Sequence, residues 1–125
     1  MDALPMLARV YWYTVEFGLI ATTGGLKAFG AGIVSSAGET VFSTTDPHVL
    51  RLCFDPVRIM RTAYMIDDFQ MTYFVIDCME QLMRGLVDLD FAPVYERWRH
   101  APPIPAGATV PGDAIWQPVS LARTA

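Results

Sequence analysis

The sequence of 125 residues predicts a mostly α-helical domain with a few short β-strands. Two observations lead to this prediction. Helix-capping signatures, such as Asp before Pro or Ser followed by Glu three residues later, recur along the chain and open several short helices. One segment, residues 69–76, instead alternates its side chains as a strand does. Because both of its faces are largely apolar, we expect a strand that is buried on both sides or lies beside other protein.

The first half of the chain opens with a long helix, for which Asp2 provides the cap and Pro5 stands in the first turn. Ser36 and Glu39 form a capping box that opens a second, shorter helix. The elements predicted for this half are a helix over residues 4–19, a turn over 22–25, an extended segment over 26–29, a loop over 30–32 and a helix over 36–43.

In the second half, Asp55, Asp77 and Asp90 each precede a predicted helix as its cap. The helices run from these caps to about residues 61, 87 and 98, and the strand over 69–76 lies between the first two. Four apolar residues of the middle helix are expected to face inward: Met79, Leu82, Met83 and Leu86. Residues 1–100 are expected to form the folded domain, and the Pro- and Gly-rich residues 101–125 a flexible tail.

The composition is unusually apolar, with 53% hydrophobic and 18% charged residues, against about 45–50% and about 25% in soluble domains. One explanation is that some helices are exposed here because they are normally covered by other sequence. The other is that the chain associates with a membrane. The second is weaker, because no run approaches the ~20 apolar residues of a membrane span. The net charge of −4, without clustered Lys or Arg, argues against nucleic-acid binding. Cys53 and Cys78 lack metal-site spacing, and no signal peptide opens the chain, so we expect a cytoplasmic protein.

Glu16 stands among aromatic residues in a helix whose pattern is otherwise that of a buried one. Trp12 and Tyr13 precede it by one helical turn and cannot neutralise it. An unpaired carboxylate in apolar surroundings costs several kcal/mol, so it must be protonated, pair with a cation or bind a metal. Arg9, two turns earlier, could supply a salt bridge, and periodicity alone leaves the salt bridge and the functional carboxylate open.

A set of motifs in fixed order resembles the aromatic amino acid hydroxylases, in particular the bacterial phenylalanine 4-monooxygenases. The motifs are Ala8–Ile20 (ARVYWYTVEFGLI), Phe29–Ser36 (FGAGIVSS), Gly38-Glu39, Met60–Thr62, Tyr64, Ile66–Gln70 and Tyr73–Ile76. The resemblance implies the C-terminal part of a hydroxylase catalytic domain. It also implies an enzyme that uses iron(II), tetrahydrobiopterin or a related tetrahydropterin, and dioxygen to convert L-phenylalanine to L-tyrosine. A monomer is implied for a full-length bacterial enzyme, although the oligomeric state stays open.

The same resemblance assigns site residues one at a time. For Trp12 and Phe17 the alternative is that they simply pack in the core, and for the loop with Gly32 and Ser35 it is an ordinary turn. The assignments are Glu16 as the iron ligand, Tyr11 as a catalytic-site tyrosine near pterin and iron, Trp12 and Phe17 as walls of the substrate's aromatic pocket, Gly32 and Ser35 as the loop over the substrate, and Tyr64 on a loop at the site's mouth.

The family also supplies two histidine ligands from a His-x-x-x-x-His segment before the Glu helix. This chain has only His48, in a turn, and His100, before a Pro-rich stretch, and neither stands in such a motif. We therefore expect part of a larger enzyme that is inactive alone. The alternatives are a non-catalytic module that binds an aromatic amino acid or stabilises another subunit, and a chain that does not fold independently.

Overall fold

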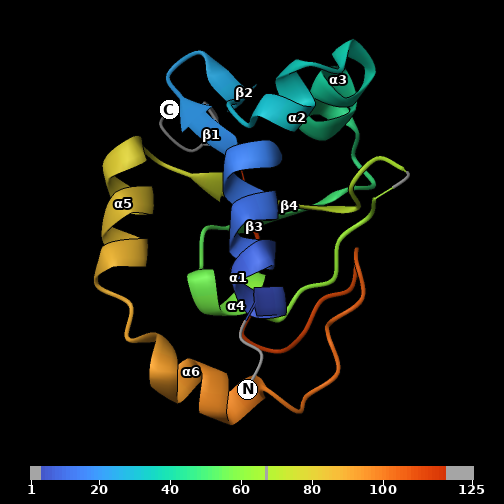
Figure 1. Cartoon of the computed structure of the whole chain (residues 1–125). Coiled ribbons are helices and arrows are strands. Elements are labelled where there is room, and N and C mark those ends of the chain that lie inside the picture. The colour runs from blue at the N-terminus through green and yellow to red at the C-terminus, as the bar shows by residue number, and fades with distance from the viewer. Residues whose placement is uncertain (1–3, 67, 118–125) are drawn as a thin grey trace.

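The structure is a computed structural model that describes residues 4–66 and 68–117. Within these residues, short helices surround a four-stranded sheet (Figure 1). The helical elements are α1 (Leu4–Tyr11), the π-helical turn η1 (Trp12–Glu16), α2 (Ala31–Val34), α3 (Ala37–Thr45), α4 (Pro56–Met60), α5 (Met79–Val87) and α6 (Phe91–Trp98). The strands are β1 (Leu19–Thr22), β2 (Gly25–Ala28), β3 (Leu50–Cys53) and β4 (Thr72–Ile76). The predicted fold class is confirmed.

The strand β4 lies inside the sheet, whose strand order is β2-β1-β4-β3. β1 and β2 form an antiparallel hairpin, whereas β4 runs parallel to β1 and to β3. All five residues of β4 are buried, as expected for a strand with parallel neighbours and cover on both faces. The strand predicted over residues 69–76 is thus confirmed in a shorter form.

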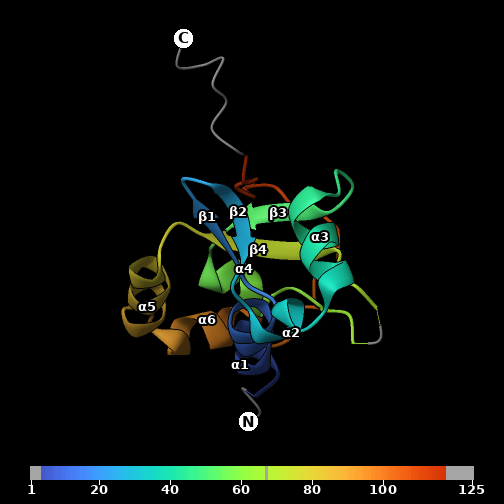
Figure 2. The same cartoon turned by 90° about the horizontal axis from the view of Figure 1, so that it is seen from above.

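Two hydrophobic clusters cover the two faces of the sheet. Successive strand residues point to opposite faces, so Phe74 belongs to one cluster while Tyr73 and Val75 belong to the other. The first cluster brings α1, α4 and α6 together, and Figure 2 shows these helices gathered on the same side of the sheet. The second cluster packs Ile33 of α2 and Phe42 of α3 against the opposite face.

The first helix ends earlier than predicted. It widens into the π-helical turn η1 and stops at Glu16, and residues 19–22 form β1 instead of a helical end. Leu19 is fully buried and pairs with Val75 of β4, so tertiary pairing overrides the local helical pattern here. The loop predicted over residues 30–32 is also wrong, because α2 begins at Ala31.

Two of the predicted caps are present as hydrogen bonds. The Ser36 hydroxyl accepts from the Glu39 N–H at 3.2 Å, and Asp55 accepts from two N–H groups in the first turn of α4. The cap predicted for α5 is wrong, because its N-cap residue is Cys78 and not Asp77. Asp90 is the N-cap residue of α6 as predicted, but neither Cys78 nor Asp90 makes a side-chain cap hydrogen bond. Asp2, the cap predicted for the first helix, lies outside the described residues.

The inward face predicted for α5 is only partly correct. Leu82 is buried, but Met79 and Met83 are 51% and 58% exposed, and Leu86 is 36% exposed. The physical reason is position: α5 stands at the edge of the molecule in Figure 1 and contacts few other elements. Apolar side chains are exposed along α1 as well, where Leu7 is 47% exposed.

Residues 101–117, assigned by sequence to a flexible tail, return to the body of the domain. Ile104 is buried and forms a bridge with Thr62, and Ile115 forms a bridge with Leu52 of β3. The flexibility itself stays a prediction, and residues 118–125 lie outside the described part. Among the helices of the described residues, none has both the length and the apolar character that crossing a membrane requires.

Candidate active site

Glu16 is half-buried at the last position of η1. The hydroxyl of Tyr11 donates a hydrogen bond to Glu16 Oε1 at 3.0 Å. In the π-helical turn, the Phe17 N–H bonds back to the Trp12 carbonyl at 2.9 Å, a spacing of five residues. That wider turn allows two side chains five positions apart to meet.

Arg9 does not neutralise this carboxylate within the described residues. Its Nη1 donates instead to the Met60 carbonyl oxygen at 2.7 Å, which ties α1 to the end of α4. The hydrogen bond from Tyr11 is therefore the polar contact that the structure gives Glu16. The bond to the carboxylate, followed by its negative charge, raises the pKa of Tyr11 above its ordinary value.

Gly32 lies directly against the Glu16 carboxylate. A Cβ atom at residue 32 would stand 2.9 Å from Glu16 Oε2 and 3.0 Å from Phe17 Cζ, closer than side chains normally approach. Glycine thus lets α2 approach the carboxylate. Ser35 is exposed, and its hydroxyl donates to the Gly32 carbonyl at 3.1 Å, closing the C-terminal turn of α2.

Three aromatic rings form a stack beside this carboxylate. The Trp12 ring lies 4.8 Å from that of Phe17 and 4.6 Å from that of Tyr64, at interplanar angles of 31° and 21°. Tyr13 meets Tyr64 edge-on from the core side. The three rings form an aromatic cluster, and aromatic rings of this kind pack favourably against further rings.

The indole N–H of Trp12 is buried and has no hydrogen-bond partner among the described residues. Leaving such a donor unpaired costs about 1–3 kcal/mol. A group bound beside the stack could satisfy it. Every site residue predicted from the sequence thus joins one continuous set of contacts: Tyr11, Trp12, Glu16, Phe17, Gly32, Ser35 and Tyr64. Their individual roles stay predictions.

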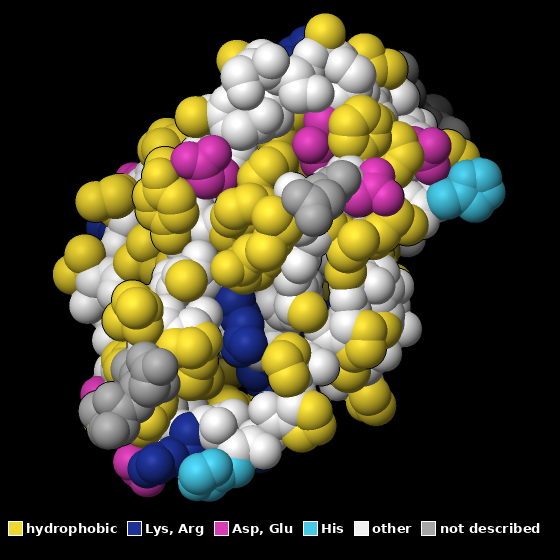
Figure 3. Space-filling view, turned by 45° about the vertical axis from the view of Figure 1, so that its right-hand side comes forward, with side chains coloured by type: hydrophobic (Ala, Val, Ile, Leu, Met, Phe, Trp, Pro, Cys, Tyr) yellow, Lys and Arg dark blue, Asp and Glu magenta, His cyan; other side chains and the backbone are white. Residues whose placement is uncertain are grey.

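The two histidines lie apart from this set. His48 is 88% exposed in its side chain and lies 3.4 Å from Asp46, and His100 is exposed after α6. Figure 3 shows histidine side chains at opposite ends of one face. In the described residues, no cluster of three or more His, Cys, Asp or Glu could hold a metal ion.

Sequence reasoning missed two buried polar networks elsewhere in the domain. The Glu39 carboxylate accepts from the Gln70 N–H at 2.9 Å and from the Tyr73 hydroxyl at 2.6 Å. Burial, and next this hydrogen bond, raise the pKa of Tyr73. Arg58 and Asp113 form a buried ion pair at 2.7 Å. The sequence pattern assigned Glu39 only to a helix cap and did not indicate its buried contacts with Gln70 and Tyr73. No local pattern links Arg58 to Asp113, which lies 55 positions away.

Comparison with known proteins gives a consistent result. The model of the biopterin-dependent aromatic amino acid hydroxylase family matches residues 2–96. The phenylalanine-4-hydroxylase of Ralstonia nicotianae is 54% identical over 115 residues, which are 92% of this chain and 36% of that protein. The corresponding protein of Caulobacter vibrioides is 51% identical, over 92% of this chain and 39% of its own length.

Solved structures agree with these matches. The iron- and phenylalanine-bound crystal structure of phenylalanine hydroxylase from Chromobacterium violaceum superposes with a TM-score of 0.87 at 50% identity. The match covers 91% of this chain and 42% of that chain. This chain therefore spans well under half the length of the relatives that it matches.

Proposed function

Because the chain belongs to the biopterin-dependent aromatic amino acid hydroxylase family, we propose that it forms part of a phenylalanine 4-monooxygenase. The reaction is the hydroxylation of L-phenylalanine to L-tyrosine with dioxygen, iron(II) and a tetrahydropterin. One observation carries the proposal: Glu16, hydrogen-bonded by Tyr11, directly precedes Phe17 of an aromatic cluster of the kind that packs against another ring. The identity to named phenylalanine-4-hydroxylases supports the choice of substrate.

The donor set fits iron(II) in part. Glu16 provides a half-buried carboxylate without a cationic partner in the described residues, and a two-His, one-carboxylate set is the usual ligand set of non-haem iron oxygenases. The described residues provide the carboxylate, so two imidazoles must come from other sequence. When bound, iron(II) would supply the activation of dioxygen together with the pterin. We infer that this chain alone is inactive.

The other residues would position the substrate and the ligand. Trp12, Phe17 and Tyr64 would form the wall against which the phenyl ring packs, and would exclude water from one side of it. Tyr11 would hold the Glu16 carboxylate in one orientation through its hydrogen bond. Gly32 would keep backbone rather than a side chain next to the carboxylate, and Ser35 would hold the Gly32 carbonyl through its hydroxyl at the end of α2.

The cellular setting proposed is the cytoplasm. Cys53 and Cys78 are both free thiols, and a reducing compartment keeps thiols in this form. L-Phenylalanine, dioxygen and the tetrahydropterin are the proposed partners. The oligomeric state proposed for the complete enzyme is a monomer.

The test is the conversion of phenylalanine to tyrosine, dependent on iron(II) and tetrahydropterin. It compares this chain alone with the same chain joined to the part of the Chromobacterium violaceum enzyme that it does not match. We expect activity in the joined protein only. Glu16→Gln should abolish it, whereas Glu80→Gln, at an exposed ion pair on α5, should leave it unchanged.

Two results would contradict the proposal. If the joined protein is folded and iron-loaded but does not hydroxylate phenylalanine, the proposed activity is wrong. Hydroxylation by the short chain would mean that other ligands complete the site. Phenylalanine binding by the short chain without iron, measured by calorimetry, would instead favour a non-catalytic binding module.

A further inference from the structure

A segment near the C-terminal end, which we call the strap (residues 104–116), bridges two parts of the domain. At its start, the Ile104 N–H donates to the Arg61 carbonyl at 2.6 Å, and the Ile104 carbonyl accepts from the Ala63 N–H at 2.8 Å. At its end, the Ala114 carbonyl accepts from the Cys53 N–H at 2.8 Å. The strap is thus hydrogen-bonded both to residues 61–63, which follow α4, and to the edge strand β3.

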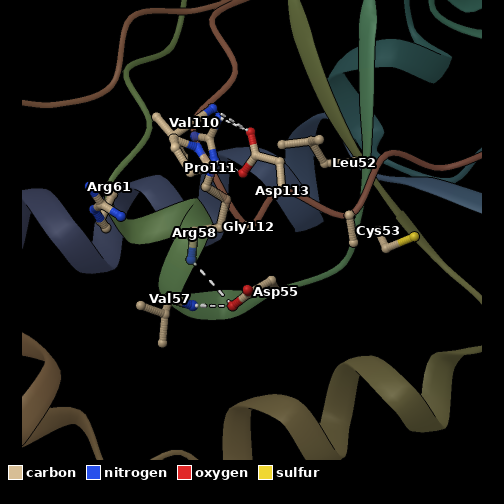
Figure 4. A pocket seen from close by; sticks show the side chains of 11 residues that line it. Leu52, Cys53, Asp55, Val57, Arg58, Arg61, Val110, Pro111, Gly112 and Asp113 are labelled. Atoms are coloured by element: carbon tan, nitrogen blue, oxygen red, sulfur yellow. Dashed lines mark hydrogen bonds and ion pairs between the residues drawn. The ribbon is translucent and has the colours of Figure 1, made fainter.

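One buried ion pair fastens the strap between these ends. Arg58 Nε donates to Asp113 Oδ1 at 2.7 Å and Arg58 Nη2 donates to Asp113 Oδ2 at 3.1 Å, with both side chains 6% exposed. The remaining donors of the guanidinium reach the Ala108 carbonyl at 2.8 Å and the Thr62 hydroxyl. Figure 4 shows Asp113 facing the guanidinium from the strap. A two-point bond of this kind fixes orientation as well as distance.

One residue, Ala63, connects the strap to the aromatic stack. Both backbone groups of Ala63 are occupied: its N–H donates to the strap residue Ile104, and its carbonyl accepts from the Tyr13 hydroxyl. The next residue, Tyr64, stacks on Trp12 at 4.6 Å. The backbone directly before Tyr64 is therefore bonded to the strap on one side and to Tyr13 on the other.

We propose that Arg58 and Asp113 are positioning residues: their ion pair holds the strap on Ala63 and thereby keeps Tyr64 stacked on Trp12 in the wall of the phenylalanine pocket. The catalytic meaning of this inference rests on the proposed function. Its structural content concerns the position of one ring and is measurable without activity. Asp113 lies beyond the residues that the family model matches.

The first experiment follows the ring itself in the full 125-residue chain. Stacking on an indole shifts the Tyr64 ring protons upfield in NMR spectra. Asp113→Asn should abolish that shift and speed hydrogen exchange at the Ala63 N–H about tenfold or more. Asp113→Glu, which keeps the charge, should restore much of both. Ser36→Ala is the control, because it removes a helix cap of α3 that does not touch the strap.

A second variant covers the case in which Asp113→Asn does not fold. Gly107 has a φ of 83° in the strap, so Gly107→Ala strains the strap while leaving the ion pair's side chains in place. It should also reduce the Tyr64 shift. The inference is overturned if Tyr64 keeps its shift and Ala63 its protection in the folded variants, or if Ser36→Ala changes both as much.

The second experiment measures kinetics in the joined protein described above. Asp113→Asn should raise KM for phenylalanine several-fold and change kcat less, because the pocket wall moves while Glu16 stays. An unchanged KM, with Tyr64 displaced, would overturn the positioning role. If the joined protein with the natural sequence shows no hydroxylation, the proposed function fails, and the NMR experiment alone decides the inference.

Discussion

Gly30 tests how closely the segment before α2 must approach Glu16. A Cβ atom at residue 30 would lie 2.5 Å from the Glu16 carbonyl carbon and 2.6 Å from the Gly18 nitrogen, and closer still to the Glu16 oxygen. These are backbone atoms, which cannot swing aside as a side chain does. The φ of Gly30 is −67°, a value that any residue adopts, so Gly30→Ala introduces crowding without backbone strain.

The expected cost follows from these distances. Ordinary contacts begin at 3.4 Å, so relieving all three contacts requires residue 30 and residues 16–18 to separate by roughly 1 Å. Overpacking of this kind costs about 1–3 kcal/mol. The shift also stretches two hydrogen bonds that the Gly18 carbonyl accepts, from Phe29 and Gly30, each contributing about 0.5–1.5 kcal/mol. We expect Gly30→Ala to lower the free energy of unfolding by about 3 kcal/mol.

Urea unfolding followed by circular dichroism measures this loss. With an m-value of about 2 kcal/mol per M, the midpoint should fall by roughly 1.5 M. Gly24→Ala is the matched control, since a Cβ there would have Thr22 Oγ1 at 3.8 Å as its nearest neighbour, and it should stay within about 0.5 kcal/mol of the natural chain. A Gly30→Ala midpoint equal to that of Gly24→Ala would refute the reasoning.

Three further outcomes are expected. Asp55→Ala should cost about 1 kcal/mol in urea unfolding because it removes two cap hydrogen bonds, while Asp90→Ala, whose side chain caps nothing, should cost under about 0.5 kcal/mol. Glu16→Gln should lower the pKa of Tyr11 toward its ordinary value, as followed by NMR titration; an unchanged pKa would contradict their hydrogen bond. The hydrogen bond to its arginine partner lowers the pKa of Asp113, so the stability it contributes is present above the unfolded-state pKa and lost as pH falls through the folded-state pKa. Asp113→Asn should therefore make stability less sensitive to pH in the acid range, and an unaltered acid slope would exclude this role.

The elements that the sequence predicted correctly depend on neighbouring residues. The caps at Ser36 and Asp55 form because a side-chain oxygen reaches an N–H two or three positions ahead. The end of the first helix depends instead on Leu19 pairing with Val75, and no local pattern reports that distant partner. The strand β3 likewise depends on a distant partner, because it forms by pairing with β4.

The contacts of the candidate site also divide into local ones, which the sequence indicates, and distant ones, which it does not. Tyr11 and Glu16 stand on one continuous segment, where a charged residue among aromatics was visible in the sequence. The contact of Glu16 with Gly32 requires α2 to fold back, which only the resemblance to a known family suggested. The buried partners Arg58 and Asp113 join segments 55 positions apart, so neither pattern nor spacing could pair them.

The π-helical turn has a consequence for any attempt to stabilise this protein. In a regular α-helix, which advances about 100° per residue, side chains at positions 11 and 16 would point about 140° apart. Substitutions over residues 12–16 that favour ordinary α-helical winding would strengthen the segment and, in the same step, rotate the carboxylate of Glu16 away from Tyr11 and from α2. In residues 12–16, a gain in thermal tolerance would come with the displacement of the proposed iron ligand, and selection for stability alone would act against the proposed site.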